Sequence, residues 1–269
     1  MTVIEVSGLF VYPVKSCAGI ALDEARVTTT GFDYDRRWMV VGDDGRFLSQ
    51  RQHPALARVR VRLNGEFLQL DAPNVAQLEI PLEETTGPTR RVTVWKDECA
   101  AIDEGQSAAE FFSSFLQVGA RLVRLADENS RPLGTSTAQP GDRVSFADAY
   151  PFLLLSEASL DGLNRRLSLP LPMDRFRPNI VVRGCPAHAE DGWSSVRIGD
   201  VDFRVVKPCA RCVVTTTNQE TGERGPEPLR TLSTYRLFDG EVNFGQNLIH
   251  VGRGTVRLGA QVVVLAVQR

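Results

Sequence analysis

The stretch Lys207-Pro208-Cys209-Ala210-Arg211-Cys212-Val213-Val214-Thr215-Thr216-Thr217 joins two of the five cysteines to a β-branched run. Because Val and Thr are enriched in strands, the run predicts a β-strand over residues 212–217. A thiolate acts as a nucleophile or a soft metal ligand when neighbouring Lys or Arg charges favour it. We therefore expect Arg211 to favour the anionic form of Cys212. The alternative is that both cysteines only fill core space, because free Cys is among the most buried residue types.

The spacing Cys209-x-x-Cys212 is also that of a zinc knuckle or a dithiol redox motif. A structural zinc site needs four ligands, and the chain has no second pair of this kind and only three scattered histidines, His53, His188 and His250. Thioredoxin-type chemistry places the motif at a helix N-terminus, whereas a strand is expected to follow here. A zinc site and a thioredoxin-type redox motif are therefore both disfavoured.

Outside this stretch, hydrophobic patterning indicates mostly strands. Strands are expected over residues 3–13, 24–30, 38–41, 56–64, 67–70, 91–95, 152–155, 179–182, 196–198, 201–206 and 261–267. Helical spacing is found over residues 107–116, and a helix capped by Ser156 is expected to continue to about residue 167. We expect residues 127–143 to form a long polar loop that influences access to the site. The predicted fold class is α+β, mainly β, with a smaller mixed α/β N-terminal domain over residues 1–120 and a β-barrel domain over residues 121–269.

Composition excludes several classes of protein. The 269 residues are 42% hydrophobic and 24% charged, as in an ordinary globular protein. Lys and Arg total 31 against 33 Asp and Glu, so no global positive field attracts nucleic acid or an anionic membrane. We find no signal peptide and no apolar run long enough for a membrane span. Five cysteines do not suggest a disulfide framework, so we expect a cytoplasmic protein with reduced thiols.

Three short motifs carry cations beside turns. Lys15 and Ser16 follow a predicted strand in Tyr12-Pro13-Val14-Lys15-Ser16-Cys17-Ala18-Gly19, where a turn suits a bound phosphate. Asp35-Arg36-Arg37-Trp38 and Phe176-Arg177-Pro178-Asn179 each start a strand. A solvated lysine, a surface charge cluster and a structural ion pair are the alternative interpretations. Pyridoxal phosphate on Lys15 is conceivable but not favoured, because no Asp or aromatic partner is identifiable.

Taken together, these motifs resemble one family. The three motifs, Pro151-Phe152-Leu153-Leu154-Leu155-Ser156-Glu157-Ala158-Ser159-Leu160, the Cys209–Cys212 motif with its Thr-rich run, and Phe244-Gly245-Gln246-Asn247 occur in the order found in MOSC-domain proteins with an N-terminal MOSC partner domain. That family includes the mitochondrial amidoxime-reducing components and the bacterial YcbX-type proteins. The resemblance spans nearly the whole chain.

The resemblance implies a molybdenum-cofactor (molybdopterin) enzyme in which Cys212 is the protein's catalytic metal ligand. Lys15, Ser16, Arg36, Arg177 and Asn179 match family positions that hold the cofactor, and Arg211 is expected to add a charge or hydrogen bond beside it. The implied reaction is reductive removal of oxygen from N-hydroxylated compounds such as hydroxylamines, amidoximes and N-hydroxylated bases.

The electron source is expected to be a separate protein. Iron–sulfur clusters need four closely spaced cysteines, and the chain reaches Arg269 without a cysteine-rich ferredoxin domain. A ferredoxin, a flavoprotein or a small haem protein are the expected donors. A second function stays open: a molybdenum-cofactor or sulfur carrier, with a persulfide on Cys212 and no reductase turnover. An inert fold that binds nothing is the third alternative.

Overall fold

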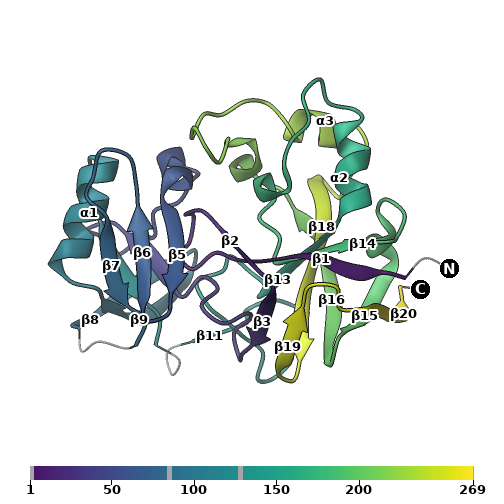
Figure 1. Ribbon diagram of the computed structural model, residues 1–269, viewed down its shortest axis with the longest axis horizontal. Helices are drawn as coiled ribbons and strands as arrows, with labels where there is room; N and C mark the ends of the chain where they lie inside the picture. Colours follow the sequence, from purple (N-terminus) through teal and green to yellow (C-terminus); the bar gives the residue numbers. More distant parts are fainter. Residues whose placement is uncertain (1–2, 84–86, 127–129, 269) are drawn as a thin grey trace.

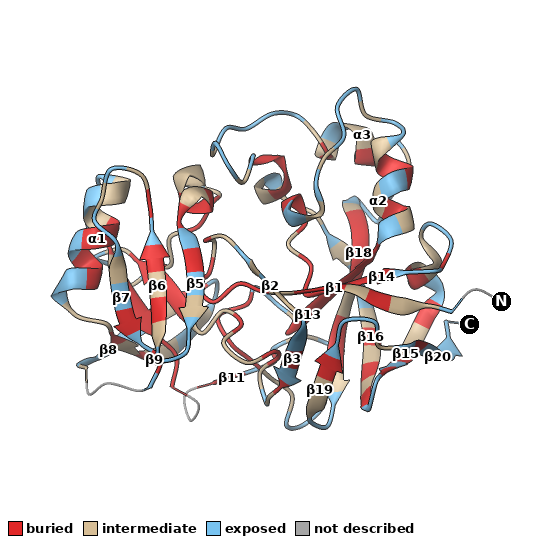
Figure 2. Ribbon diagram, viewed as in Figure 1, coloured by how far each residue is buried: buried red, intermediate tan, exposed pale blue. Residues whose placement is uncertain are grey.

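A computed structural model describes residues 3–83, 87–126 and 130–268 (Figure 1). Strands dominate and helices are few, which confirms the mainly β, α+β class. Buried residues follow the strands in the middle of each half, while the outward faces of the helices are exposed (Figure 2). Within the described residues, no helix combines the length and apolar character that crossing a bilayer requires.

The larger half is a β-barrel. Its strands follow the order β2-β1-β14-β13-β18-β16-β15-β20, and β17 pairs with β18. The sheet closes on itself, because the Val6 amide donates to the Ala260 carbonyl at 2.9 Å and the Val262 amide to that of Ile4 at 2.8 Å. The strands are β1 (Glu5–Val11), β2 (Ile20–Leu22), β13 (Phe152–Ser156), β14 (Ile180–Arg183), β15 (Trp193–Ile198), β16 (Val201–Ala210), β17 (Leu237–Phe238), β18 (Glu241–Val251) and β20 (Val262–Val267).

The smaller half contains two sheets and a helix. One sheet has the order β4-β10-β9-β8, formed by β4 (Trp38–Val41), β10 (Arg121–Arg124), β9 (Asp97–Asp103) and β8 (Thr89–Val94). The other has the order β5-β6-β7, formed by β5 (Arg60–Asn64), β6 (Phe67–Asp71) and β7 (Leu78–Pro81). Helix α1 (Gln106–Leu116) buries Phe111 and Phe112 in a core that contains Trp38 and Leu68, so one apolar cluster joins the helix to both sheets.

Short elements complete the chain. They are β3 (Glu24–Val27) with β19 (Gly254–Arg257), β11 (Arg131–Pro132) with β12 (Arg143–Val144), the helices α2 (Glu157–Asn164) and α3 (Leu229–Ser233), and the 3₁₀ turns η1 (Pro54–Arg58), η3 (Met173–Arg175), η4 (Ala189–Gly192) and η5 (Val213–Thr216). Ser156 caps α2 as expected, because its hydroxyl accepts from the Ser159 amide at 3.1 Å. The helix ends at Asn164, earlier than the expected residue 167.

Strand pairing links the ends of the chain. β1 pairs with β14, and β3 pairs with β19, so the first strands contribute to the larger half. Conversely, β10 begins at Arg121 and pairs with β4 in the smaller half. The division at residue 120 remains a prediction, but hydrogen bonds cross it in both directions.

The strand expected over residues 56–64 is wrong in part, and the strand expected over residues 212–217 is not formed. Residues 56–58 belong to η1, where the Leu56 amide donates to the His53 carbonyl at 3.0 Å, and the strand begins only at Arg60. Residues 213–216 form η5 instead of a strand. There the hydroxyl of Thr215 donates to the Cys212 carbonyl at 2.9 Å, and that of Thr216 to the Val213 carbonyl at 2.7 Å. Thr side chains that bond back to the backbone in this way compete with sheet pairing.

Candidate functional site

A cavity of about 420 Å³ lies between the two halves, and all seven residues singled out in the sequence line it. They come from four separate segments: the turn after β1, the turn before β4, the segment after η3, and the end of β16. The residues are Lys15, Ser16, Arg36, Arg177, Asn179, Arg211 and Cys212. Motifs up to about 200 positions apart in the chain thus meet around one space.

The two cysteines have different cationic partners. Arg211 donates from Nη1 to the sulfur of Cys209 at 2.9 Å and from Nη2 to the Phe176 carbonyl at 2.7 Å. Cys212 instead accepts from Nη2 of Arg51 at 3.4 Å. The hydrogen bond to the Cys212 sulfur thus comes from Arg51 and not from Arg211. Side chains two positions apart on an extended chain lie on the same side, which brings Arg211 to Cys209. Arg211 consequently lies beside Cys209, while Cys212 directly precedes η5.

Arg51 belongs to a cluster at the cavity wall. Its Nη2 lies 3.2 Å from the Asp148 carboxylate, and its guanidinium lies 4.5 Å from the centre of the Trp95 ring. The same carboxylate accepts from Trp95 Nε1 at 3.2 Å and from the buried Lys15 ammonium. Burial alone would raise the pKa of Asp148, but Lys15 and Arg51 hold it well below its usual range. Burial lowers the pKa of Lys15, and Asp148 opposes that shift.

A second group of contacts positions two guanidiniums. Those of Arg36 and Arg177 lie 4.4 and 4.2 Å from the centre of the Tyr12 ring. Arg36 also donates to Asp35 at 2.5 Å and to the side-chain oxygen of Asn179 at 3.1 Å. Asn179, which is only 1% exposed, is held in turn by the Leu153 amide and the Phe10 carbonyl. Asn179 therefore orients Arg36 from within the protein.

The backbone around the cavity is strained. Ser16, Arg36, Trp95 and Arg177 line it and have φ values of 71°, 49°, 58° and 55°. This left-handed region is costly for residues other than glycine. Such residues persist where the surrounding structure holds them, and they cluster at ligand sites.

The donor set fits an anionic cofactor bound through a soft ligand. Six cationic side chains line the cavity, Lys15, Arg36, Arg51, Arg177, Lys207 and Arg211, against the single carboxylate of Asp148 among the described lining residues. Nε of Arg211 is buried and has no hydrogen-bond partner in the described part of the chain. Arg and Lys are suited to phosphate oxygens, and the partly exposed Cys212 sulfur suits a metal that prefers thiolates.

Sequence reasoning missed Arg51, Trp95 and Asp148. Each lies outside the recognised motifs, and each reaches the cavity only because the two halves meet there. The sole local signal was Trp95-Lys96-Asp97, a bulky aromatic residue at the turn between β8 and β9.

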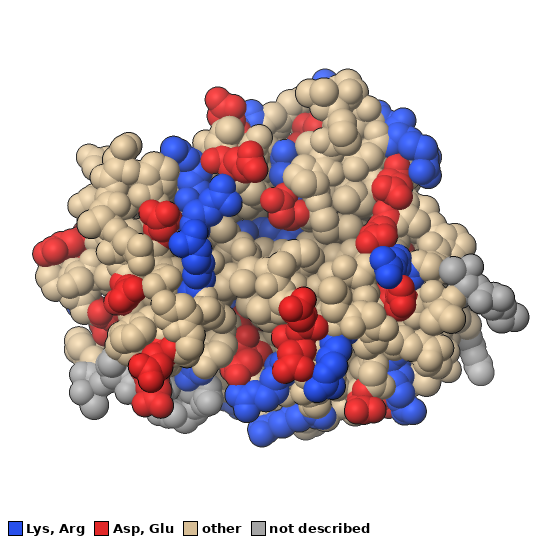
Figure 3. Space-filling model, in the orientation of Figure 1, with Lys and Arg blue, Asp and Glu red and all other residues tan. Residues whose placement is uncertain are grey.

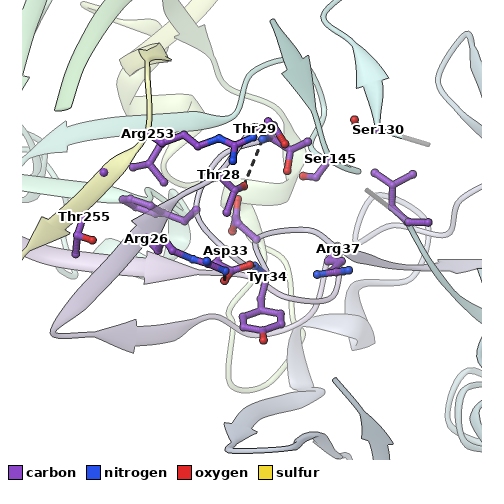
Figure 4. A pocket seen from close by; sticks show the side chains of 17 residues that line it. Arg26, Thr28, Thr29, Asp33, Tyr34, Arg37, Ser130, Ser145, Arg253 and Thr255 are labelled. Carbon is purple, nitrogen blue, oxygen red and sulfur yellow. Dashed lines mark hydrogen bonds and ion pairs between the residues drawn. The ribbon is translucent and has the colours of Figure 1, made fainter. Parts of the chain in front are cut away.

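Another cavity, of about 400 Å³, lies between β3, β19 and the segments that join the halves (Figure 4). Its lining includes three arginines, Arg26, Arg37 and Arg253, and several serines and threonines, among them Thr28 and Ser145. Arg26 is paired with Asp33 at 2.5 Å. Since its described lining includes no cysteine, we take the Cys212 cavity as the functional site.

Comparison with known proteins gives a consistent result over nearly the whole chain. Residues 3–119 match the family model of the MOSC N-terminal beta barrel domain, and residues 141–263 match that of the MOSC domain. Mitochondrial amidoxime-reducing component 1 of Mus musculus is 37% identical over 279 residues, covering 97% of this chain and 82% of the relative. The corresponding protein of Homo sapiens is 36% identical with the same coverage. Mitochondrial amidoxime reducing component 2 of Rattus norvegicus is 38% identical over 251 residues, 88% of this chain and 74% of the relative.

Proposed function

Because this chain belongs to the MOSC-domain family of the mitochondrial amidoxime-reducing components, we propose that it is a molybdenum-cofactor-dependent reductase of N-hydroxylated compounds. For a hydroxylamine, the reaction is R–NH–OH + 2 e⁻ + 2 H⁺ → R–NH₂ + H₂O. Amidoximes and N-hydroxylated bases lose oxygen in the same way.

The observation that carries the proposal is the convergence of Cys212 and six cations on one cavity. The cofactor of this family carries a phosphate on its pterin and a metal that accepts a thiolate. An anion and a soft metal are what this lining suits. The strained turns at Ser16, Arg36 and Arg177 add support, because they fix donors at positions that the backbone would not otherwise favour.

Each residue has a distinct proposed role. Cys212 ligates the metal through its sulfur, and Arg51 places a positive charge beside that sulfur. Lys15, Ser16, Arg36, Arg177 and Arg211 hold the anionic part of the cofactor, and Asn179 orients Arg36. The bound molybdenum cofactor supplies the two-electron chemistry that removes the substrate oxygen, and the protein sets ligation, orientation and access.

We propose that electrons come from a separate protein, of the ferredoxin, flavoprotein or small haem class. The five cysteines are all free, which suits a reducing compartment such as the cytoplasm. An iron–sulfur cluster needs four cysteine thiolates at one place, and in the described part of the chain no three metal-ligating side chains gather in this way.

The test is turnover of benzamidoxime by protein expressed in a host that makes the cofactor, with reduced methyl viologen as donor. We expect the wild type and Cys209→Ser to form benzamidine, because Cys209 is outside the proposed ligand set, and Cys212→Ser to form none. Cys209→Ser is a matched control, since it removes a neighbouring sulfur from the same cavity.

The carrier alternative gives a different result in that experiment. A carrier would retain cofactor without forming benzamidine. If Cys212 holds a persulfide, a two-electron reducing agent would release its outer sulfur as sulfide and leave the Cys212 thiol. If the protein binds molybdenum but turns over no benzamidoxime, hydroxylamine or N-hydroxylated base, the reductase function is contradicted and the carrier function is supported.

A further inference from the structure

We propose that a second cavity beside the Cys212 site receives the uncharged, apolar body of the substrate, with Trp95 as its main contact surface. This inference rests on the proposed function and adds the substrate class. The cavity has a volume of about 460 Å³, and Trp95, Pro132, Thr135, Val144 and Ala149 contribute to its walls. It is called the annex below.

The annex adjoins the Cys212 cavity. Trp95, Asp148 and Ala149 line both spaces, so these residues form their common boundary. A small molecule at this boundary has one end in the Cys212 cavity and the other in the annex. An N-hydroxylated compound with a body larger than its N–O group needs such an arrangement.

Charge distinguishes the two spaces. The Cys212 cavity has six cations against one carboxylate, whereas the annex has two cations, Lys96 and Arg131, against two carboxylates, Asp97 and Asp148. Arg131 lies 2.7 Å from Asp97, and Asp148 is paired with Lys15 and Arg51. Three of the four charged groups are therefore paired within the protein, and the fourth, Lys96, is exposed to solvent. The annex consequently favours a neutral ligand over an ion.

Trp95 is held in place and yet is open to a ligand. Phe47 contacts its ring edge-to-face at a centroid distance of 5.0 Å, Arg51 covers one side at 4.5 Å, and Asp148 accepts from its Nε1 at 3.2 Å. The residue nevertheless remains 46% exposed. Its φ of 58° is unfavourable for a bulky side chain. A strained aromatic residue fixed by three contacts is a preorganised surface for a flat ring.

The substrate class follows from these features. Ligand cavities are mostly apolar with a few placed polar groups, and aromatic pairs gain from stacked or edge-to-face contact. We infer that N-hydroxylated compounds with a neutral aromatic body, such as arylamidoximes, bind better than small polar ones.

Binding is measured by calorimetry on the cofactor-loaded protein without an electron donor, so that no turnover occurs. The probes are benzamidoxime and the small N-hydroxyurea. For Trp95→Leu we expect the Kd of benzamidoxime to rise on the order of fivefold, and for Trp95→Phe less than about twofold, because the ring is kept. The Kd of N-hydroxyurea should change by less than about twofold in both variants.

Two further variants complete the design. Thr135→Trp places bulk into the annex from another wall and should also weaken benzamidoxime binding, so the test does not depend on one substitution. Phe238→Leu removes a similarly exposed aromatic side chain, 51% exposed, that lines neither space, and should leave the Kd unchanged.

Equal benzamidoxime affinity in the wild type, Trp95→Leu and Thr135→Trp would overturn the inference, even if the wild type reduces benzamidoxime. Failure of the proposed function is recognised separately, as a loaded protein that binds benzamidoxime through Trp95 but reduces no N-hydroxylated compound.

Discussion

Arg51 has the most direct contact with the proposed metal ligand of any residue outside the recognised motifs. Its guanidinium reaches the Cys212 sulfur, the Asp148 carboxylate and the Trp95 ring. No other cation has a hydrogen bond to that sulfur among the described residues. The side chain therefore joins the thiol to the wall shared by both cavities.

We expect Arg51→Gln to lower the turnover of benzamidoxime about 10- to 100-fold, because it removes a charge-assisted contact in the site. The turnover of Arg51→Lys should lie between that of Arg51→Gln and that of the wild type, since lysine keeps the charge without the planar guanidinium. Arg62→Gln, an exposed arginine on β5, should retain wild-type turnover. Wild-type turnover by Arg51→Gln would remove Arg51 from the site.

The environment of His250 determines part of the pH dependence of the free energy of unfolding. It contacts the Phe152 ring at a centroid distance of 5.7 Å, and burial lowers its pKa below the ordinary 6.5. Asp142 opposes the shift, while Arg204 and Arg253 add to it. As the pH falls below 6.5 the unfolded chain takes up the proton first, so this residue destabilises the fold at acidic pH and not above 6.5.

His250→Leu should therefore reduce the loss of stability between pH 7.5 and pH 5.5, measured by urea unfolding at both values. The comparison is of slopes, so an overall change in stability from repacking does not affect it. An identical pH dependence in the variant and the wild type would contradict the assigned environment of His250.

At the scale of elements, β18 shows what the sequence could not predict. Its 11 residues occupy the middle of the barrel between β13 and β16, yet Gly245, Gln246 and Asn247 interrupt the apolar alternation that signals a strand. Gly245 has φ of 81°, and a Cβ there would lie 2.8 Å from the Leu154 carbonyl oxygen. Close packing on β13 requires this glycine, and only the neighbouring strand reveals it.

Gly245→Ala should destabilise the fold by about 2 to 4 kcal/mol, combining backbone strain with the clash. Gly240→Ala is the matched control, because Gly240 has a similar φ of 77° but no atom within 4 Å of an added Cβ. It should cost about 1 to 2 kcal/mol. Equal losses in chemical denaturation would show that the close approach of β13 to Gly245 contributes nothing.

Local patterns predicted the helix α1, the Ser156 cap and strands such as β4 and β6, because their residues follow one period and lie between turn signals. The strand predicted for the Thr-rich run was wrong, because the Thr215 and Thr216 hydroxyls donate to preceding carbonyls and favour η5 over a strand. All seven motif residues reached one cavity, whereas Arg51 and Asp148 required the packing of the halves and had no local signal.

At the scale of the whole molecule, the two halves depend on each other. The N-terminal strands β1 and β3 pair with β14 and β19 of the larger half. Backbone hydrogen bonds of Ile4 and Val6 close the barrel. Figure 1 shows β1 running from the outer edge of the larger half toward the smaller half, and Figure 3 shows Lys and Arg side chains within the hollow between the halves. Closure of the barrel and formation of the site therefore require the same segments.

We expect a fragment of residues 121–269 to lack a cooperative unfolding transition, because it exposes the edge of β14 and removes β1 from the barrel core. Calorimetry together with dye binding to exposed apolar surface tests this. A sharp transition at a temperature near that of the full chain would show that the second half folds independently.

The central claim is that Cys212 ligates molybdenum in a site built by both halves. Its most direct test is the molybdenum content per chain of the wild type, Cys209→Ala and Cys212→Ala, expressed in a host that makes the cofactor. We predict about one molybdenum per chain in the wild type and Cys209→Ala, and a clear loss in Cys212→Ala. No molybdenum in the wild type, or an equal content in all three proteins, would contradict the account.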